Sequence, residues 1–216
     1  MNNDAKRLAG KREEDRVYEA VSELPGVKVY RNLYVPYERA GQTAELDLVL
    51  LCNKGIFTIE VKSFSKSLVV GSQVRWEWTQ HYRCKTSGAK AKRKFLNPLR
   101  QVDQQISVLA RYLGTPPKQI GGLVCFSDKA TLKVPARSDS GIAVLQTRFV
   151  ASHIRRCTAN RKPRFSLTEL RRIAQRLDAA SNVSAAVKRR HIIQVRQAER
   201  ARKAEQERRR ASRKKP

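Results

Sequence analysis

Acidic residues are scarce in this 216-residue chain, in which 19 Asp and Glu stand against 46 Lys and Arg. The resulting formal net charge of +27 attracts polyanions, and the release of counterions from a phosphate backbone favours binding. The charge therefore indicates nucleic acid as the main partner. An anionic membrane surface or a ribosome is the alternative that charge alone leaves open.

Long hydrophobic runs are also absent. No apolar segment approaches the roughly 20 residues that a bilayer requires, and no N-terminal stretch resembles a signal peptide. We therefore expect no membrane partner and a cytoplasmic location, with association with the nucleoid as the alternative.

Only 4 cysteines and 3 histidines are present, and their spacing does not suggest a metal site. No two cysteines form a CxxC pair and no histidine lies at ligand spacing to a cysteine, so zinc is not expected. Scattered cysteines in a chain without a secretion signal favour free thiols over disulfides. We also expect no haem, flavin or nucleotide cofactor.

The periodicity of apolar residues predicts an α/β fold with helices packed around a mixed sheet. Helices are expected at 4–24, 97–113, 149–156 and from Ser166 or Thr168 to Ala180. Strands are expected at 27–35, twice within 43–64, and at 67–70, 74–79, 120–126 and 142–145. The basic segment 83–94 is expected to be a loop, and Trp76 and Trp78 to share one strand face.

The chain is expected to have three parts. Residues 1–157 form the main domain, and residues 158–183 a helical extension that packs on or near it. Residues 184–216 carry 13 basic and 3 acidic residues and no aromatic, so they cannot build a core. We expect this basic arm to be helical or disordered.

The stretch TAELDLVLLCNKGIFTIEVKSF at residues 43–64 predicts a β-hairpin with its turn at Asn-Lys-Gly. If the turn places Cys52 opposite Gly55, the residue numbers of every cross-strand pair add to 107. Asp47 then lies across from Glu60, and Glu45 lies across from Lys62. Side chains alternate along a strand, so these four would emerge on one face while the other face is apolar.

Like charges at directly opposed strand positions repel, so Asp47 and Glu60 need a compensating cation. Mg²⁺, with Mn²⁺ as the alternative, suits carboxylate oxygens, and the carbonyl of Val61 is a further candidate ligand. Lys62 could hold the attacking water or stabilise charge on a phosphoryl group. The pattern indicates a phosphodiesterase site; the alternative is a structural cross-strand ion pair such as Glu45–Lys62.

Four motifs follow one another between residues 10 and 156: GKREEDRV, then TAELDLVLL with GIFTIEVKS, then VRWEW, then FLNPLRQVDQQISVL. Their order and spacing resemble the nuclease-related domain (NERD) family. That family is similar in turn to the PD-(D/E)xK nucleases. The resemblance implies a restriction-endonuclease-like fold, in which helices flank a mixed β-sheet.

The resemblance also implies roles for individual residues. It implies metal ligands at Asp47 and Glu60 and a catalytic lysine at Lys62. Glu14 matches an acidic position that supports the metal or its water, and Gln101 matches a glutamine placed beside the phosphate or the metal.

Two of these roles have alternatives. Glu14 could be a solvated helix acid, and the chain has Glu13 where family members often have glycine. Gln101 shares its predicted helix with Gln104 and Gln105, so its position alone does not single it out.

Basic side chains are the candidates for contacts with phosphate. They are Lys85, Lys90, Lys92, Arg93 and Lys94 in segment 83–94, and Arg189, Arg190, Arg208, Arg209 and Arg210 in the basic arm.

Taken together, these features predict a metal-dependent nuclease that hydrolyses phosphodiester bonds in DNA, with RNA as the second choice. The alternative is a non-catalytic nucleic-acid-binding protein with the same fold. A third interpretation is an RNA- or ribosome-associated factor bound mainly through the arm.

Overall fold

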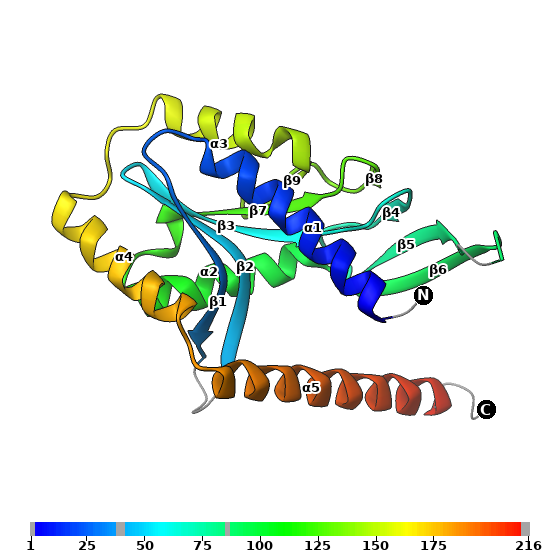
Figure 1. The fold of residues 1–216 in the computed structure, drawn as a ribbon. Helices are drawn as coiled ribbons and strands as arrows, with labels where there is room; N and C mark the ends of the chain where they lie inside the picture. The colour runs from blue at the N-terminus through cyan, green and yellow to red at the C-terminus, as the bar shows by residue number, and fades with distance from the viewer. Residues whose placement is uncertain (1–2, 38–41, 85–86, 213–216) are drawn as a thin grey trace.

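The computed structural model describes residues 3–37, 42–84 and 87–212, so the predicted phosphate contact Lys85 lies outside the described residues. Its centre is a five-stranded sheet (Figure 1). The strand order is β1 (Lys28–Pro36), β2 (Thr43–Cys52), β3 (Gly55–Lys62), β7 (Ile120–Phe126) and β9 (Ala143–Gln146). The first three strands are antiparallel neighbours and the last three are parallel, so the sheet is mixed.

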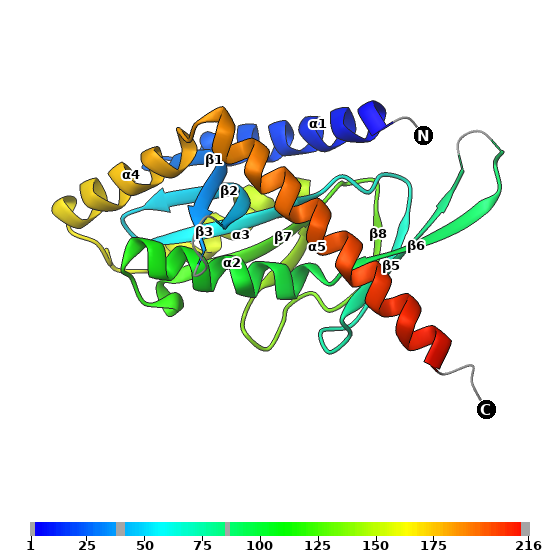
Figure 2. The ribbon, with the colours of Figure 1, turned by 90° about the horizontal axis from the view of Figure 1, so that it is seen from below.

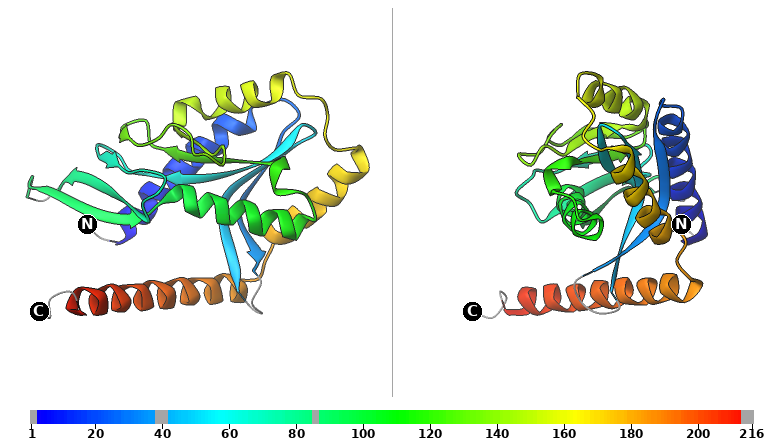
Figure 3. Two further views of the ribbon diagram at one scale, coloured as in Figure 1. Left: turned by 180° about the vertical axis from the view of Figure 1, so that it is seen from behind. Right: turned by 90° about the vertical axis from the view of Figure 1, so that its left-hand side faces the viewer.

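Helices cover both faces of this sheet (Figure 3). On one face, α1 (Asn3–Ser22) and α3 (Val150–Ala159) bury Val17 and Ile154 against Leu48. On the other face, α2 (Pro98–Leu113) and α4 (Leu167–Ser181) bury Leu109 and Leu177. Two covered faces explain why β2 and β3 read as nearly continuous apolar runs. The predicted α/β class is confirmed, and the flanked mixed sheet has the arrangement of a restriction-endonuclease-like fold.

The predicted hairpin register is confirmed where β2 and β3 pair. Paired positions sum to 107 from the turn as far as Leu48 and Ile59. The ladder ends there, because β2 continues beside β1 while β3 continues beside β7. The prediction that Asp47 pairs directly across from Glu60 is therefore wrong: the two strands separate before reaching them.

A second sheet extends from one end of the first (Figures 1 and 2). Its order is β6 (Lys90–Leu96), β5 (Glu77–Arg83), β4 (Leu68–Val70) and β8 (Thr131–Lys133). The loop predicted at 83–94 is wrong over half of that segment, because Arg83 belongs to β5 and 90–94 belong to β6, and these two strands pair as a hairpin. Lysine has low β-propensity, so the local sequence did not indicate a strand that cross-strand pairing stabilises.

The two tryptophans do not share a strand face as predicted. Trp78 is fully buried on β5 and stacks with Phe126 at 6.4 Å between ring centroids. Trp76 precedes β5 and is exposed, with the guanidinium of Arg100 at 4.8 Å from its ring centroid. The strand starts later than position 74, so the expected alternation does not reach Trp76.

Helix α2 begins at a cap that also fixes the preceding loop. The side chain of Asn97 accepts a hydrogen bond from the Leu99 N–H at 3.0 Å, as expected of an N-cap. Its amide donates to the carbonyls of Ser72, Gln73 and Arg75. These bonds set where α2 starts relative to the second sheet.

The basic arm is helical over α5 (Ala185–Ser212), a single helix of 28 residues. It starts beside the first half of β2 and runs toward the side of the molecule on which the β5–β6 hairpin projects (Figures 1 and 2). Two short 3₁₀ helices, η1 (Pro117–Gln119) and η2 (Thr147–Phe149), complete the described structure. Among the described helices, none has the length and apolarity needed to cross a membrane.

Candidate active site

An ion pair lies at the end of β3, where β2 and β3 have separated. Glu60 and Lys62 are two residues apart, so their side chains share a face, and the ammonium of Lys62 donates to Oε1 of Glu60. These side chains are only 5% and 18% exposed. A charged pair with so little water around it contributes weakly to stability and marks a candidate functional site.

Asp47 reaches β3 through its side chain. Its Oδ2 accepts a hydrogen bond from the N–H of Val61 at 2.8 Å, where the β2–β3 ladder no longer supplies a backbone acceptor. The N–H and C=O of one strand residue point to the same neighbouring strand. The Val61 carbonyl therefore faces the same gap as Asp47, next to Glu60.

Two glutamines of α2 hold the ion pair from the other side. Gln101 accepts a hydrogen bond from the ammonium of Lys62 at 3.1 Å, so this predicted residue is part of the cluster. Gln105 donates to Oε2 of Glu60 at 2.6 Å and accepts from the Thr58 hydroxyl at 3.2 Å. Gln105 was not assigned a role from the sequence. Its position four residues after Gln101 places both on one helix face, which is the signal that could have found it.

Glu14 lies on α1 at the edge of this cluster. Burial raises the pKa of Glu14; Arg31 opposes that rise, and the charges of Glu45, Asp15 and Glu60 add to it. In the described part of the chain, no hydrogen bond joins Glu14 to the other predicted site residues. The structure therefore brings Glu14 within electrostatic range of the site rather than into direct contact.

The neighbouring Glu13 has a different environment. It is buried and accepts a hydrogen bond from the hydroxyl of Thr147 at 2.6 Å, and Arg16 lies 3.6 Å from its carboxylate. Glu13 thus joins α1 to η2, and this contact orients the turn of α1 that carries Glu14.

Glu45 does not pair with Lys62, contrary to the sequence-based register. It accepts a hydrogen bond from the hydroxyl of Tyr34 at 2.7 Å and faces Nε2 of His191 at 3.4 Å. Because β2 and β3 have separated at this point, Glu45 stays with β1 and contacts α5 instead.

The charges of the cluster shift the proton affinities of its members. Burial raises the pKa of Asp47 well above its ordinary value, and the nearby carboxylate of Glu60 raises it further. Burial would lower the pKa of Lys62, but Glu60 and Asp47 outweigh that effect and raise it. The site therefore combines two repelling carboxylates with an ammonium that stays protonated.

The oxygen donors of this site suit a hard divalent cation. In the parts of the chain that are described, no three His, Cys, Asp or Glu side chains form a group able to hold a metal. Asp47, Glu60 and the Val61 carbonyl offer oxygen alone, which fits Mg²⁺ or Mn²⁺, since Mg²⁺ keeps several of its own waters. The raised pKa of Asp47 supplies a physical reason for a cation there, because positive charge would relieve the repulsion.

The basic side chains of β6 are exposed on the hairpin that projects from the second sheet (Figures 1 and 2). Lys90, Lys92 and Lys94 alternate along the strand and share one face. Arg93 points the other way: its Nε donates to Gln80 at 2.5 Å, and its charge opposes the rise in the pKa of Lys62 that Glu60 and Asp47 cause. Arg93 therefore lies within electrostatic range of Lys62.

The predicted basic residues of the arm lie on α5. Arg189 and Arg190 are exposed near its start. Arg208, Arg209 and Arg210 belong to the last turns of the helix, and their side chains lie outside what the structure describes.

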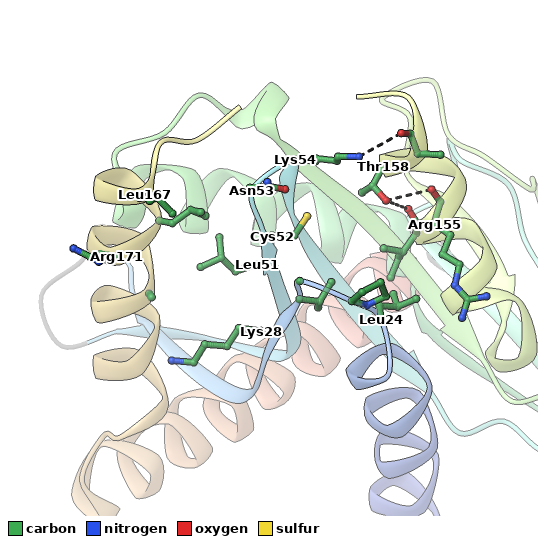
Figure 4. A pocket seen from close by; sticks show the side chains of 17 residues that line it. Leu24, Lys28, Leu51, Cys52, Asn53, Lys54, Arg155, Thr158, Leu167 and Arg171 are labelled. Atoms are coloured by element: carbon green, nitrogen blue, oxygen red, sulfur yellow. Dashed lines mark hydrogen bonds between the residues drawn. The ribbon is translucent and has the colours of Figure 1, made fainter. Parts of the chain in front are cut away.

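A pocket of about 830 Å³ lies at the opposite end of β3 from Lys62 (Figure 4). It is bounded by the end of α1, the β2–β3 turn, α3 and α4, and it is lined by apolar side chains such as Leu51 and Leu167 with basic residues at its rim. None of the predicted catalytic or metal-binding residues lines it. Its position separates it from the charged cluster.

Comparison with known families identifies one family for this chain. A family model described as the nuclease-related domain matches residues 9–127, which is more than half of the 216 residues. The match contains every residue predicted to bind metal or act in catalysis, but it ends before residue 156, where the sequence-based resemblance ended. No curated protein and no solved structure matches the chain.

Proposed function

The chain belongs to the nuclease-related domain family, and from this premise we propose that it is a metal-dependent nuclease that hydrolyses phosphodiester bonds in DNA. The observation that carries the proposal is the buried cluster at the separation of β2 and β3. There Asp47 contacts the backbone of Val61, and Lys62 contacts both Glu60 and Gln101. Carboxylates and a lysine held by fixed hydrogen bonds are the parts that phosphodiester hydrolysis needs.

In this proposal Asp47, Glu60 and the carbonyl of Val61 hold the cation. Bound Mg²⁺ would neutralise charge on the phosphoryl oxygens and lower the pKa of a coordinated water. Gln105 fixes the orientation of Glu60 through the bond to Oε2. The Val61 N–H does the same for Asp47, so both carboxylates are oriented before the substrate arrives.

Lys62 and Glu14 act on the reacting groups. The ammonium of Lys62 is oriented by Gln101 and remains charged because its pKa is raised. It would stabilise the negative charge that develops on a non-bridging phosphoryl oxygen. Glu14, whose pKa is raised mainly by burial, would accept a proton from the attacking water at its carboxylate.

The basic surface supplies affinity for the substrate. Exposed lysines on β6 and arginines on α5 bind phosphate without reading bases. The substrate is therefore recognised by its backbone, and DNA is the first polymer to test.

The decisive experiment measures cleavage of single- and double-stranded DNA and RNA with Mg²⁺, Mn²⁺ or EDTA. We expect cleavage only with a divalent ion, and a loss of about 10³-fold in Asp47→Ala, comparable to removal of a charge-stabilising group elsewhere. Asp103→Ala is the matched control, because Asp103 is an exposed aspartate on α2. Metal-dependent cleavage that survives in Asp47→Ala would contradict the proposal.

The second candidate function is binding of nucleic acid without catalysis. The observation that favours it is the net charge of +27, which serves binding with or without a working site. The same assay separates the two functions. Tight, salt-sensitive binding with no cleavage, unaffected by Asp47→Ala, would support the binding protein.

A further inference from the structure

His191 of α5 is a buried polar residue whose burial phosphate binding does not explain. His191 is 7% exposed, whereas its neighbours Arg190 and Ile192 are exposed. Its Nδ1 lies 3.0 Å from the carbonyl oxygen of Thr43 and 3.0 Å from the Thr43 hydroxyl. Its Nε2 lies 3.4 Å from the carboxylate of Glu45. Both ring nitrogens thus face oxygen atoms of β2.

Aromatic contacts complete this attachment. The ring of His191 meets Tyr34 of β1 edge-on, with 5.4 Å between centroids, and the hydroxyl of Tyr34 donates to Glu45. The ammonium of Lys188, one turn earlier on α5, lies 5.8 Å from the Tyr34 ring centroid. One side of α5 therefore contacts both β1 and β2 through His191 and Lys188.

The attachment lies beside the candidate active site. Glu45 is two residues before Asp47 on β2, where the strand leaves β3. The charge of Glu45 also raises the pKa of Glu14. The start of α5 is thus fixed to the strand that carries a proposed metal ligand.

From this attachment α5 runs toward the side of the β5–β6 hairpin (Figures 1 and 2). Basic side chains are exposed along its first turns, at Arg189, Arg190, Arg196 and Arg200. A helix of 28 residues is about 42 Å long, which matches the backbone of roughly 12 base pairs.

The composition of α5 favours a duplex as the bound form. The residues of α5 include no Phe, Tyr or Trp, and the ring of His191 is buried, whereas single-stranded nucleic acid is commonly held by stacking on exposed aromatics. Arg189, Arg196 and Arg200 are spaced by seven and four residues, which places them along one face of the helix. Such a row of charges can follow the phosphates of a double helix.

We propose that His191 is a positioning residue, which holds α5 against β2 so that a nucleic-acid duplex bound along the helix meets the active site in one orientation. This inference rests on the proposed nuclease function. His191 acts through Glu45 and Thr43, not through the substrate. The charge that binds the duplex is the same with or without this contact, so orientation and affinity are separable.

The test compares His191→Ala with Ile193→Ala, a control on the same helix at a side chain that is 54% exposed. We expect the Kd of His191→Ala for a duplex of 20 base pairs to stay within about threefold of the wild type, since the phosphate-binding charges remain. Its single-turnover cleavage rate on saturating duplex should fall by about tenfold or more, because the scissile bond is no longer aligned. His191→Gln should recover part of the rate, since its amide can donate to the Thr43 carbonyl.

A second readout needs neither metal nor nucleic acid. Hydrogen exchange of the amides at 185–195, measured in EDTA, should be faster by about tenfold or more in His191→Ala because the helix opens more readily once its tertiary contact is lost. Ile193→Ala should exchange at the wild-type rate. In thermal unfolding, Glu45→Gln should lower the free energy of unfolding by less in the His191→Ala background than in the wild type. Such non-additivity is expected of two residues in contact.

The outcomes separate this inference from the proposed function. An unchanged single-turnover rate in His191→Ala, or an affinity loss that accounts for the whole loss of cleavage, would overturn the positioning role. Unchanged exchange at 185–195 would overturn the attachment of α5. A wild type that cleaves nothing would overturn the nuclease function, while the exchange data would still decide the attachment.

Discussion

Asp47 combines opposed demands of folding and chemistry in one side chain. Its Oδ2 completes the hydrogen bonding of the Val61 N–H, which a buried backbone group requires. The same burial raises the pKa of Asp47, and Glu60 adds to the effect. An ionised Asp47 therefore destabilises the metal-free fold, a cost that is common at active sites.

Asp47→Asn should stabilise the metal-free protein and abolish metal-dependent cleavage. The amide oxygen of asparagine can still accept from Val61, but the residue carries no charge. Because the folded-state pKa of Asp47 is raised, the wild type loses stability as pH rises from the unfolded pKa through the folded pKa. In EDTA at pH 8, the Tm of Asp47→Asn should exceed that of the wild type by about 2–4 °C. For this chain length, that shift corresponds to a gain of roughly 1 kcal/mol in the free energy of unfolding.

The increase in Tm should shrink as the pH is lowered, because a protonated Asp47 in the wild type then resembles the asparagine. Asp103→Asn, at an exposed position on α2, should leave Tm unchanged at each pH. A gain in Tm that is independent of pH would assign the effect to packing rather than to the charge of Asp47.

The β5–β6 hairpin shows how strand geometry sorts basic residues. Pairing of β5 with β6 places Lys90, Lys92 and Lys94 on one exposed face, while Arg93 faces Gln80 and Phe64. As a loop, the segment could present any of these charges to phosphate. As a hairpin, it presents the three lysines on one face and directs Arg93 toward Gln80 and Phe64 on the other.

Replacing Lys90, Lys92 and Lys94 by glutamine should weaken DNA binding and reduce its salt dependence. Each lost phosphate contact lowers the magnitude of the slope of log K against log salt by about 0.9, so the slope should change by up to about 2.7. Fluorescence anisotropy at several salt concentrations measures it. The control replaces Lys118, Lys162 and Arg164, exposed basic residues near the β2–β3 turn. An equal effect in both variants would show that only net charge matters.

Across the whole molecule, the apolar core and the basic arm occupy different parts of the structure. The apolar clusters lie between the five-stranded sheet and its helices. The basic arm contains 13 basic residues in the sequence, and its described part, α5, is fixed to the core near one end at His191. We therefore propose that the arm extends the surface that binds phosphate, while the proposed metal ligands Asp47, Glu60 and Val61 all come from the core strands β2 and β3.

Deletion of residues 184–216 should lower DNA affinity by about tenfold or more at 0.1 M salt, and it should flatten the salt dependence, because counterion release scales with the number of phosphates contacted. The folded core should remain, as judged by a cooperative thermal transition. A variant with glutamine at Arg208, Arg209 and Arg210 should show a smaller loss in the same anisotropy assay. A salt slope unchanged by the deletion would mean that the arm does not contact phosphate.

Much of the site was predictable from the sequence because the turn residues and the strand and helix periods that place its side chains are local features of the chain. The turn at Asn-Lys-Gly set the register that pairs the strands as far as Leu48 and Ile59. The period of two along β3 placed Glu60 and Lys62 on one face. The helical period was sufficient to place the helices to within a few residues.

What only the tertiary structure decided depends on strands and helices that are distant in sequence. The separation of β2 from β3 follows from their outer neighbours β1 and β7, and it turned an expected Asp47–Glu60 pair into a bond from Asp47 to Val61. The contact of His191 with Glu45 joins residues 146 positions apart. The sequence alone determined which side chains could do chemistry; long-range packing decided which of them meet, because such contacts leave no periodic signal along the chain.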